Sequence, residues 1–107
     1  MDRLAKSLES ILTKNLGQEF DLDQLAHKLN RVNELQKDEI AFAMGALVRC
    51  QKASLILRVL SPSTQAKVLD VKKLDEVPST LIDPATKEVF TVRTENLRIF
   101  YTSFQST

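Results

Sequence analysis

The residue types that this sequence almost lacks already narrow what the protein can be. It has a single cysteine in 107 residues, so it cannot form an internal disulfide, and its first residues contain no apolar run of signal-peptide length. Both features predict a reducing, cytoplasmic setting. No apolar stretch approaches the roughly 18 to 20 residues that span a bilayer, because Ser54 and Arg58 interrupt the longest apolar block, residues 53–60. We therefore expect no membrane association.

Few residues could support catalysis or hold a metal or cofactor. The only glycines are Gly17 and Gly45, so the chain has no glycine-rich phosphate loop. The single histidine, His27, follows Asp23 by one helical turn, but a metal site there would need carboxylates for its other ligands, and we interpret His27 as a solvated residue. Cys50 has no general base near it in the sequence, and we interpret it as a small residue at the core edge. The sequence predicts a protein that is not an enzyme, with no metal site and no cofactor.

The charges are almost balanced. Fifteen basic and fourteen acidic residues give a net charge of +1, without the positive excess that is typical of proteins that bind nucleic acid or anionic membranes. The length and the 43% hydrophobic content are typical of one globular domain that needs no disulfide or metal to be stable. We expect a single domain over residues 1–107, with a helical half at about residues 1–53 and a β-rich half at about 54–107.

The first two predicted helices have clear local signals. Leucine and isoleucine recur at helical spacing over residues 4–16, which predicts one buried stripe, and Gly17 provides a C-terminal stop. Asp21 and Gln24 have the spacing of a capping box, in which each side chain accepts a hydrogen bond from the other residue's backbone. The second helix therefore begins after Asp21, and Asn30 is a natural end.

A third helix is predicted to follow and to extend to about Lys52. Asn33 and Gln36 repeat the capping spacing at its start. Gly45 costs such a helix about 1 kcal/mol relative to alanine, which indicates either close packing against a neighbour or a tolerated imperfection. The expected buried face consists of Ile40, Met44, Leu47 and Val48.

From residue 55 the sequence favours β-branched and aromatic residues, which predicts strands. Residues 83–86 read as a turn, and residues 72–82 are ambiguous because Pro78 argues against a central strand. The two expected hairpins pair residues 55–60 with 66–71 and residues 88–93 with 97–104. The predicted fold class is α+β, with three N-terminal helices followed by β-hairpins.

This order of elements resembles the winged helix-turn-helix superfamily. Residues 20–29 look like its second helix, residues 37–52 look like its third, and residues 48–59 look like the passage from a recognition helix into the first wing strand. The resemblance covers roughly residues 1–71 and implies an elaborated winged helix, a class that binds DNA, RNA or proteins. An unrelated α+β fold with the same order of elements is the alternative.

Two parts of the sequence are candidates for binding another protein or a second copy of this chain. The third helix contains Phe42 and Ala46, and the last strand ends with Tyr101 and Phe104. Phe42 lies off the predicted buried face, so it is either buried by a second neighbour, the interpretation that we favour, or part of an apolar patch that a partner covers. A last strand at the sheet edge could pair with a strand of a partner.

Nucleic-acid binding is the alternative function. A winged helix would place basic side chains of its third helix and hairpin near phosphates, and the candidates are Lys37, Arg49, Lys52 and Arg58. Asp38 and Glu39 on the same helix would repel phosphates. The sequence therefore predicts a non-catalytic protein-interaction module, such as an adaptor or accessory subunit, more strongly than a DNA- or RNA-binding protein.

Overall fold

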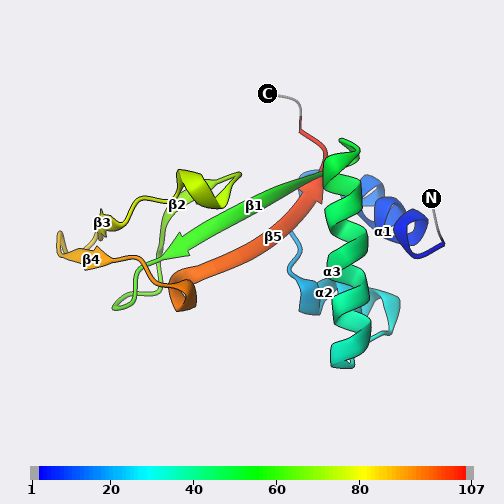
Figure 1. Ribbon diagram of the computed structural model, residues 1–107, viewed down its shortest axis with the longest axis horizontal. Helices are drawn as coiled ribbons and strands as arrows, with labels where there is room; N and C mark the ends of the chain where they lie inside the picture. The colour runs from blue at the N-terminus through cyan, green and yellow to red at the C-terminus, as the bar shows by residue number, and fades with distance from the viewer. Residues whose placement is uncertain (1–2, 106–107) are drawn as a thin grey trace. The chain divides into compact units, whose positions relative to one another are not determined.

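The computed structural model describes residues 3–105, and within them the chain forms three α-helices followed by five β-strands (Figure 1). This confirms the predicted α+β class. The helices are α1 (Arg3–Lys14), α2 (Leu22–Leu29) and α3 (Glu34–Arg49), and the strands are β1 (Ala53–Leu60), β2 (Lys67–Val71), β3 (Thr80–Ile82), β4 (Val89–Thr91) and β5 (Leu97–Ser103). Short 3-10 helices occupy Leu74–Glu76 and Thr94–Asn96.

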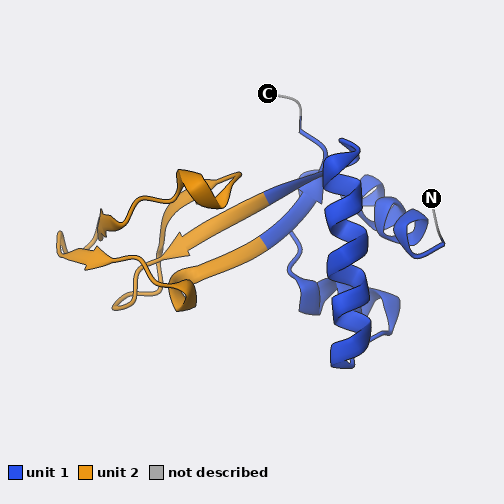
Figure 2. Ribbon diagram, in the orientation of Figure 1, with its two compact units in different colours: residues 1–55, 100–107 blue, residues 56–99 orange. Residues whose placement is uncertain are grey.

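The described residues divide into two compact units, which Figure 2 shows in different colours. The helical unit comprises residues 3–55 and 100–105, and the β unit comprises residues 56–99. The end of the chain therefore belongs to the helical unit and not to a separate β-rich half. The expectation of a single domain stays a prediction.

The predicted capping box at the start of α2 is present. The Asp21 carboxylate accepts a hydrogen bond from the Gln24 backbone N–H at 2.8 Å, and the Gln24 side chain accepts one from the Asp21 N–H at 2.8 Å. At the other end, Asn30 adopts a left-handed conformation with φ of 58°, which ends the helix. Local sequence is enough to define this helix.

The ends of α1 and α3 differ from the prediction. Helix α1 stops at Lys14, and Leu16 is 76% exposed instead of continuing the buried stripe. Helix α3 has the predicted cap, because Asn33 accepts a hydrogen bond from the Gln36 N–H at 2.8 Å, but it ends at Arg49 and not near Lys52. Gln51 adopts a positive φ of 59°, and the Lys52 N–H donates back to the Leu47 carbonyl at 2.9 Å. This closure normally uses glycine, so the sequence did not reveal it.

The core of the helical unit forms where α3 packs against both α1 and α2. Phe20, in the α1–α2 loop, and Tyr101, in β5, exchange two backbone hydrogen bonds of 2.8 and 2.7 Å. This pair joins the end of the chain to the helices. The core residues include Leu8, Leu12, Phe20, Leu25, Ile40, Met44, Leu47 and Tyr101.

The first predicted hairpin is confirmed and the second is wrong. β1 pairs with β2 in antiparallel register, with Arg58 opposite Asp70. β4 pairs with β3 and not with β5, while β5 lies next to β1 in a sheet of order β2-β1-β5. The tight turn at residues 83–86, followed by Lys87 with φ of 65°, joins β3 to β4 as an antiparallel hairpin.

Asp83 holds two turns of the β unit together. One carboxylate oxygen accepts hydrogen bonds from the Ala85 and Thr86 N–H groups, and the other accepts from the hydroxyls of Ser61 and Thr64. These hydrogen bonds stabilise the charged carboxylate and lower the pKa of Asp83 to about 2, and the bond from Ser61 has the largest effect. Burial of the side chain acts in the opposite direction, but its effect is smaller. The sequence predicted a turn here but not its connection to residues 61–64.

Candidate interaction surface on the third helix

Helix α3 is buried on one side and exposed on the other. Ile40 and Met44 are completely buried against the other helices, whereas Phe42 is 78% exposed and Leu35 is 71% exposed. The interpretation that Phe42 is buried by a second neighbour is therefore wrong. Within the helical unit, α1 and α2 cover only the face of α3 that carries Ile40 and Met44, so Phe42 belongs to an open apolar surface.

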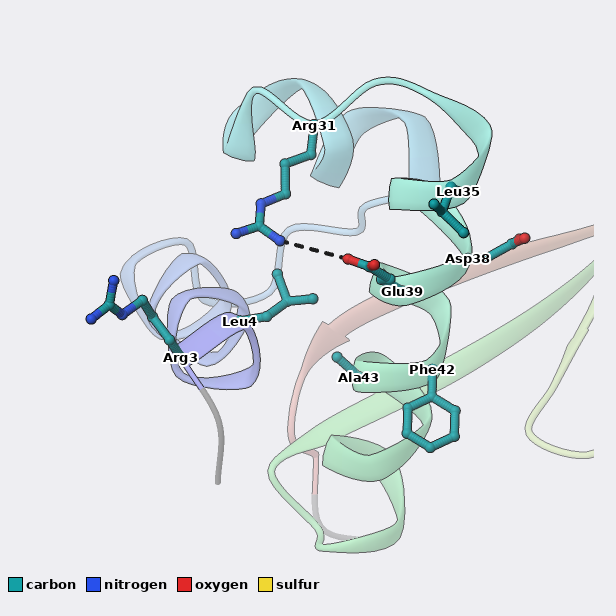
Figure 3. A pocket seen from close by; sticks show the side chains of 8 residues that line it. All are labelled: Arg3, Leu4, Arg31, Leu35, Asp38, Glu39, Phe42 and Ala43. Atoms are coloured by element: carbon teal, nitrogen blue, oxygen red, sulfur yellow. Dashed lines mark ion pairs between the residues drawn. The ribbon is translucent and has the colours of Figure 1, made fainter.

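A groove of about 520 Å³ lies beside this exposed side (Figure 3). Leu4 from α1 and Ala43 from α3 contribute its apolar part, and Arg31 reaches toward Glu39 across it with an N–O distance of 3.9 Å. The side chains of Arg31 and Glu39 are 40% and 54% exposed, so solvent screens this ion pair and it contributes at most about 1 kcal/mol. The lining residues are Arg3, Leu4, Arg31, Leu35, Asp38, Glu39, Phe42 and Ala43.

The exposed side of α3 carries a second periodic pattern that the sequence analysis missed. We define the outer stripe as Leu35, Asp38, Phe42, Gly45 and Arg49, whose positions are alternately three and four residues apart. All but Gly45 are exposed. This spacing is that of the contact positions in a coiled coil, and it places the five residues on one helix face, opposite the core. The signal was present in the sequence, but the charge at Asp38 and the glycine at position 45 concealed it.

The other predicted protein-binding residues do not form one surface. Ala46 is half-buried on α3, and Phe104 is 45% exposed beyond the end of β5. Tyr101 is only 5% exposed, and its burial raises the pKa of its hydroxyl. The side chain of Tyr101 belongs to the core, so its assignment as a protein-binding residue is corrected.

The last strand, β5, is an outer strand of the order β2-β1-β5, which is the condition for pairing with a strand of a partner. At Tyr101, however, both backbone hydrogen-bonding groups are already used by Phe20. The loop between α1 and α2 therefore protects this part of the edge from pairing with another strand.

Three of the four basic candidates for nucleic-acid binding lie in ion pairs. Lys37 contacts Asp23 at 2.9 Å and Glu34 at 3.2 Å, and these carboxylates, Asp23 first, raise the pKa of Lys37. Lys52 lies 3.6 Å from Glu9. Asp23 and Glu9 come from other helices, so the sequence alone did not reveal either pair.

Arg58 is the third of these residues, and it is bound across the β1–β2 hairpin. Its Nε donates to the Asp70 carboxylate at 2.8 Å and its second terminal nitrogen donates at 3.0 Å, which lowers the pKa of Asp70. This two-point, charge-assisted contact fixes the orientation of the guanidinium relative to the Asp70 carboxylate. Arg49, by contrast, lies on the exposed side of α3. Its guanidinium lies beside Gly45, since a Cβ atom placed on that glycine would be 3.4 Å from a terminal nitrogen of Arg49.

No protein-family model, curated protein or solved structure matches the chain.

The remaining candidates do not assemble into a chemical site. His27 is exposed on α2, and Cys50 is exposed just after α3 instead of at the core edge. Among residues 3–105 no three side chains of the metal-binding types lie close enough to share an ion. Over the same residues, no helix has the length and apolar character needed to cross a membrane. The outer stripe and the adjoining groove are the candidate functional site.

Proposed function

We propose that this protein is a non-catalytic protein-interaction module whose binding surface is the exposed side of α3. The observation that carries the proposal is the joint exposure of Leu35 and Phe42, at 71% and 78%, on one face of a helix. Completely covering one such side chain is worth about 1.5 to 3 kcal/mol, so a partner that covers both gains a substantial part of its binding energy there. Isolated exposed apolar residues are common, but two large ones beside a groove form a potential anchor site.

The charges around the groove support a protein partner in particular. Arg3 and Arg31 lie on one side of the groove and Asp38 and Glu39 on the other, so both signs border an apolar floor. An apolar centre with a polar rim is typical of protein interfaces, in which the charges set the orientation of the partner. A phosphate backbone would meet two carboxylates here.

The alternative, a winged-helix nucleic-acid-binding protein, has one supporting observation. Within residues 3–71 the chain forms three helices followed by the antiparallel ribbon of β1 and β2, the order on which the winged-helix resemblance depends. Lys37, Lys52 and Arg58 are, however, occupied by carboxylates of the chain itself, which reduces the positive charge offered to phosphate. We therefore rank this function second.

Site-specific photocrosslinking tests the proposal. A benzoylphenylalanine side chain at position 42 is expected to form a crosslink to a defined protein, and untagged wild-type protein should compete with it more effectively than the Phe42→Ser variant. The same probe at Leu74, which is 69% exposed in the β unit, is the matched control and should not form this crosslink.

Equal labelling from positions 42 and 74, or no protein product at position 42, would overturn the interaction surface. A parallel titration with duplex DNA at low and moderate salt tests the alternative. Binding that weakens steeply as salt rises would support nucleic-acid binding, because phosphate contacts release counterions.

A further inference from the structure

We infer that the partner of α3 is a second copy of this chain, bound through an antiparallel pair of α3 helices related by a two-fold axis. This inference rests on the proposed function of α3 and names its partner. The outer stripe has the spacing that allows two helices to pack along their length. A two-fold axis requires the surface to be complementary to itself, and one register of the stripe meets that condition by charge and by side-chain size.

In that register Phe42 of each copy lies opposite Gly45 of the other. Gly45 has no side chain. Apart from its chain neighbours and the nearby backbone of α3, a Cβ atom placed on Gly45 would have only the Arg49 guanidinium within 4 Å. Because Gly45 has no side chain, an aromatic ring of a second copy can approach the α3 backbone at this position once the Arg49 guanidinium moves aside. The pairing gives a physical role to a glycine whose presence inside a helix is otherwise unfavourable by about 1 kcal/mol relative to alanine.

The same register places Asp38 of each copy opposite Arg49 of the other. On one helix these two side chains are about three turns apart and cannot meet, since an α-helix rises about 1.5 Å per residue. Between two antiparallel helices they form two symmetric pairs of opposite charge, one on each side of the central Phe42 and Gly45 contacts. Arg49, whose guanidinium rests beside Gly45 in the single chain, rotates outward to make this contact.

Charge also excludes a second register. Sliding the two helices until Leu35 lies opposite Phe42 would bring Asp38 next to Glu39 of the second copy, and like charges in contact are unfavourable. The net charge of +1 gives little long-range repulsion between two copies. Because one helix from each copy forms the contact, we expect a weak and reversible dimer.

Charge reversal tests this arrangement by sedimentation velocity over a range of protein concentrations. The wild-type chain is expected to show reversible dimerisation. Asp38→Arg alone and Arg49→Asp alone should each weaken self-association at least tenfold, because each variant places like charges opposite one another at both pairs. Mixing the two variants in equal amounts should restore dimers, since each chain then supplies the charges that the other needs.

The control is Asp75→Arg, an exposed residue of the β unit that undergoes the same charge change and should dimerise like the wild type. Far-UV circular dichroism checks that the helices of each variant form, and Asp38→Ala with Arg49→Gln provide milder variants of the same pairs. These two substitutions should also weaken self-association, and mixing them should restore it only in part, because the mixed dimer keeps one of the two pairs of Asp38 and Arg49.

A wild-type chain that stays monomeric at every concentration would overturn the inference, as would mixed variants that fail to form dimers. If position 42 nevertheless crosslinks to a different protein, the interaction module stands and only the second copy is excluded. If position 42 crosslinks to no protein, both proposals fail.

Discussion

Replacing Phe42 by serine should leave the stability of the monomer almost unchanged. Phe42 is 78% exposed, so only about a fifth of its surface is covered by the chain. A phenylalanine that is completely buried covers about 200 Å². A fifth of that area, at about 25 cal/mol per Å², corresponds to about 1 kcal/mol as an upper bound. Serine and phenylalanine have similar helix propensities, so the helix itself adds little to the difference.

Met44 is the matched control because it lies two residues further along the same helix and is completely buried. Met44→Ala should cost about 2 to 5 kcal/mol, since it removes a core side chain and leaves a cavity. The two variants therefore separate the exposed face of α3 from its buried face, although the substitutions are only two positions apart.

Urea unfolding, followed by far-UV circular dichroism at low protein concentration, measures both changes. The helical signal reports the helical unit, in which both residues lie. If Phe42→Ser destabilised the chain as much as Met44→Ala at every protein concentration, Phe42 would be a core residue and the reasoning would be refuted. If α3 pairs with a second copy, the difference between Phe42→Ser and the wild type should instead grow as the protein concentration rises.

Two further predictions concern local contacts. The Asp83 carboxylate has a folded-state pKa of about 2, below its usual value, so the stability that it contributes should be present above about pH 4 and be lost as the pH falls toward 2. The amide NMR signals of Ala85 and Thr86 should therefore titrate near pH 2 in the wild type and should not do so in Asp83→Asn. A titration midpoint near pH 4 would contradict this hydrogen-bond network. Asp21→Ala removes the capping side chain of α2 and should lower the free energy of unfolding in urea by about 1 kcal/mol, whereas Asp21→Ser keeps a capping oxygen and should recover most of that loss. An equal loss of stability in both variants would show that the loss does not come from the cap.

The sequence determined the local features of this protein. The capping pairs Asp21 with Gln24 and Asn33 with Gln36 define where α2 and α3 begin, because each pair joins residues three positions apart. The antiparallel hairpin of β1 and β2 was also predicted, since a short turn connects its strands. The end of α3 was misplaced because Gln51, and not a glycine, adopts the left-handed conformation.

Only the tertiary structure decided which distant segments meet. The position of β5 next to β1, the hydrogen bonds between Phe20 and Tyr101, and the ion pair of Lys37 with Asp23 all join residues that no local pattern relates. The exposure of Phe42 has the same origin: periodicity showed that it lies off the buried stripe, but whether a neighbour covers a second face depends on how the helices pack. Side-chain burial is a property of the assembled unit, and the candidate site on α3 follows from the face that α1 and α2 leave uncovered.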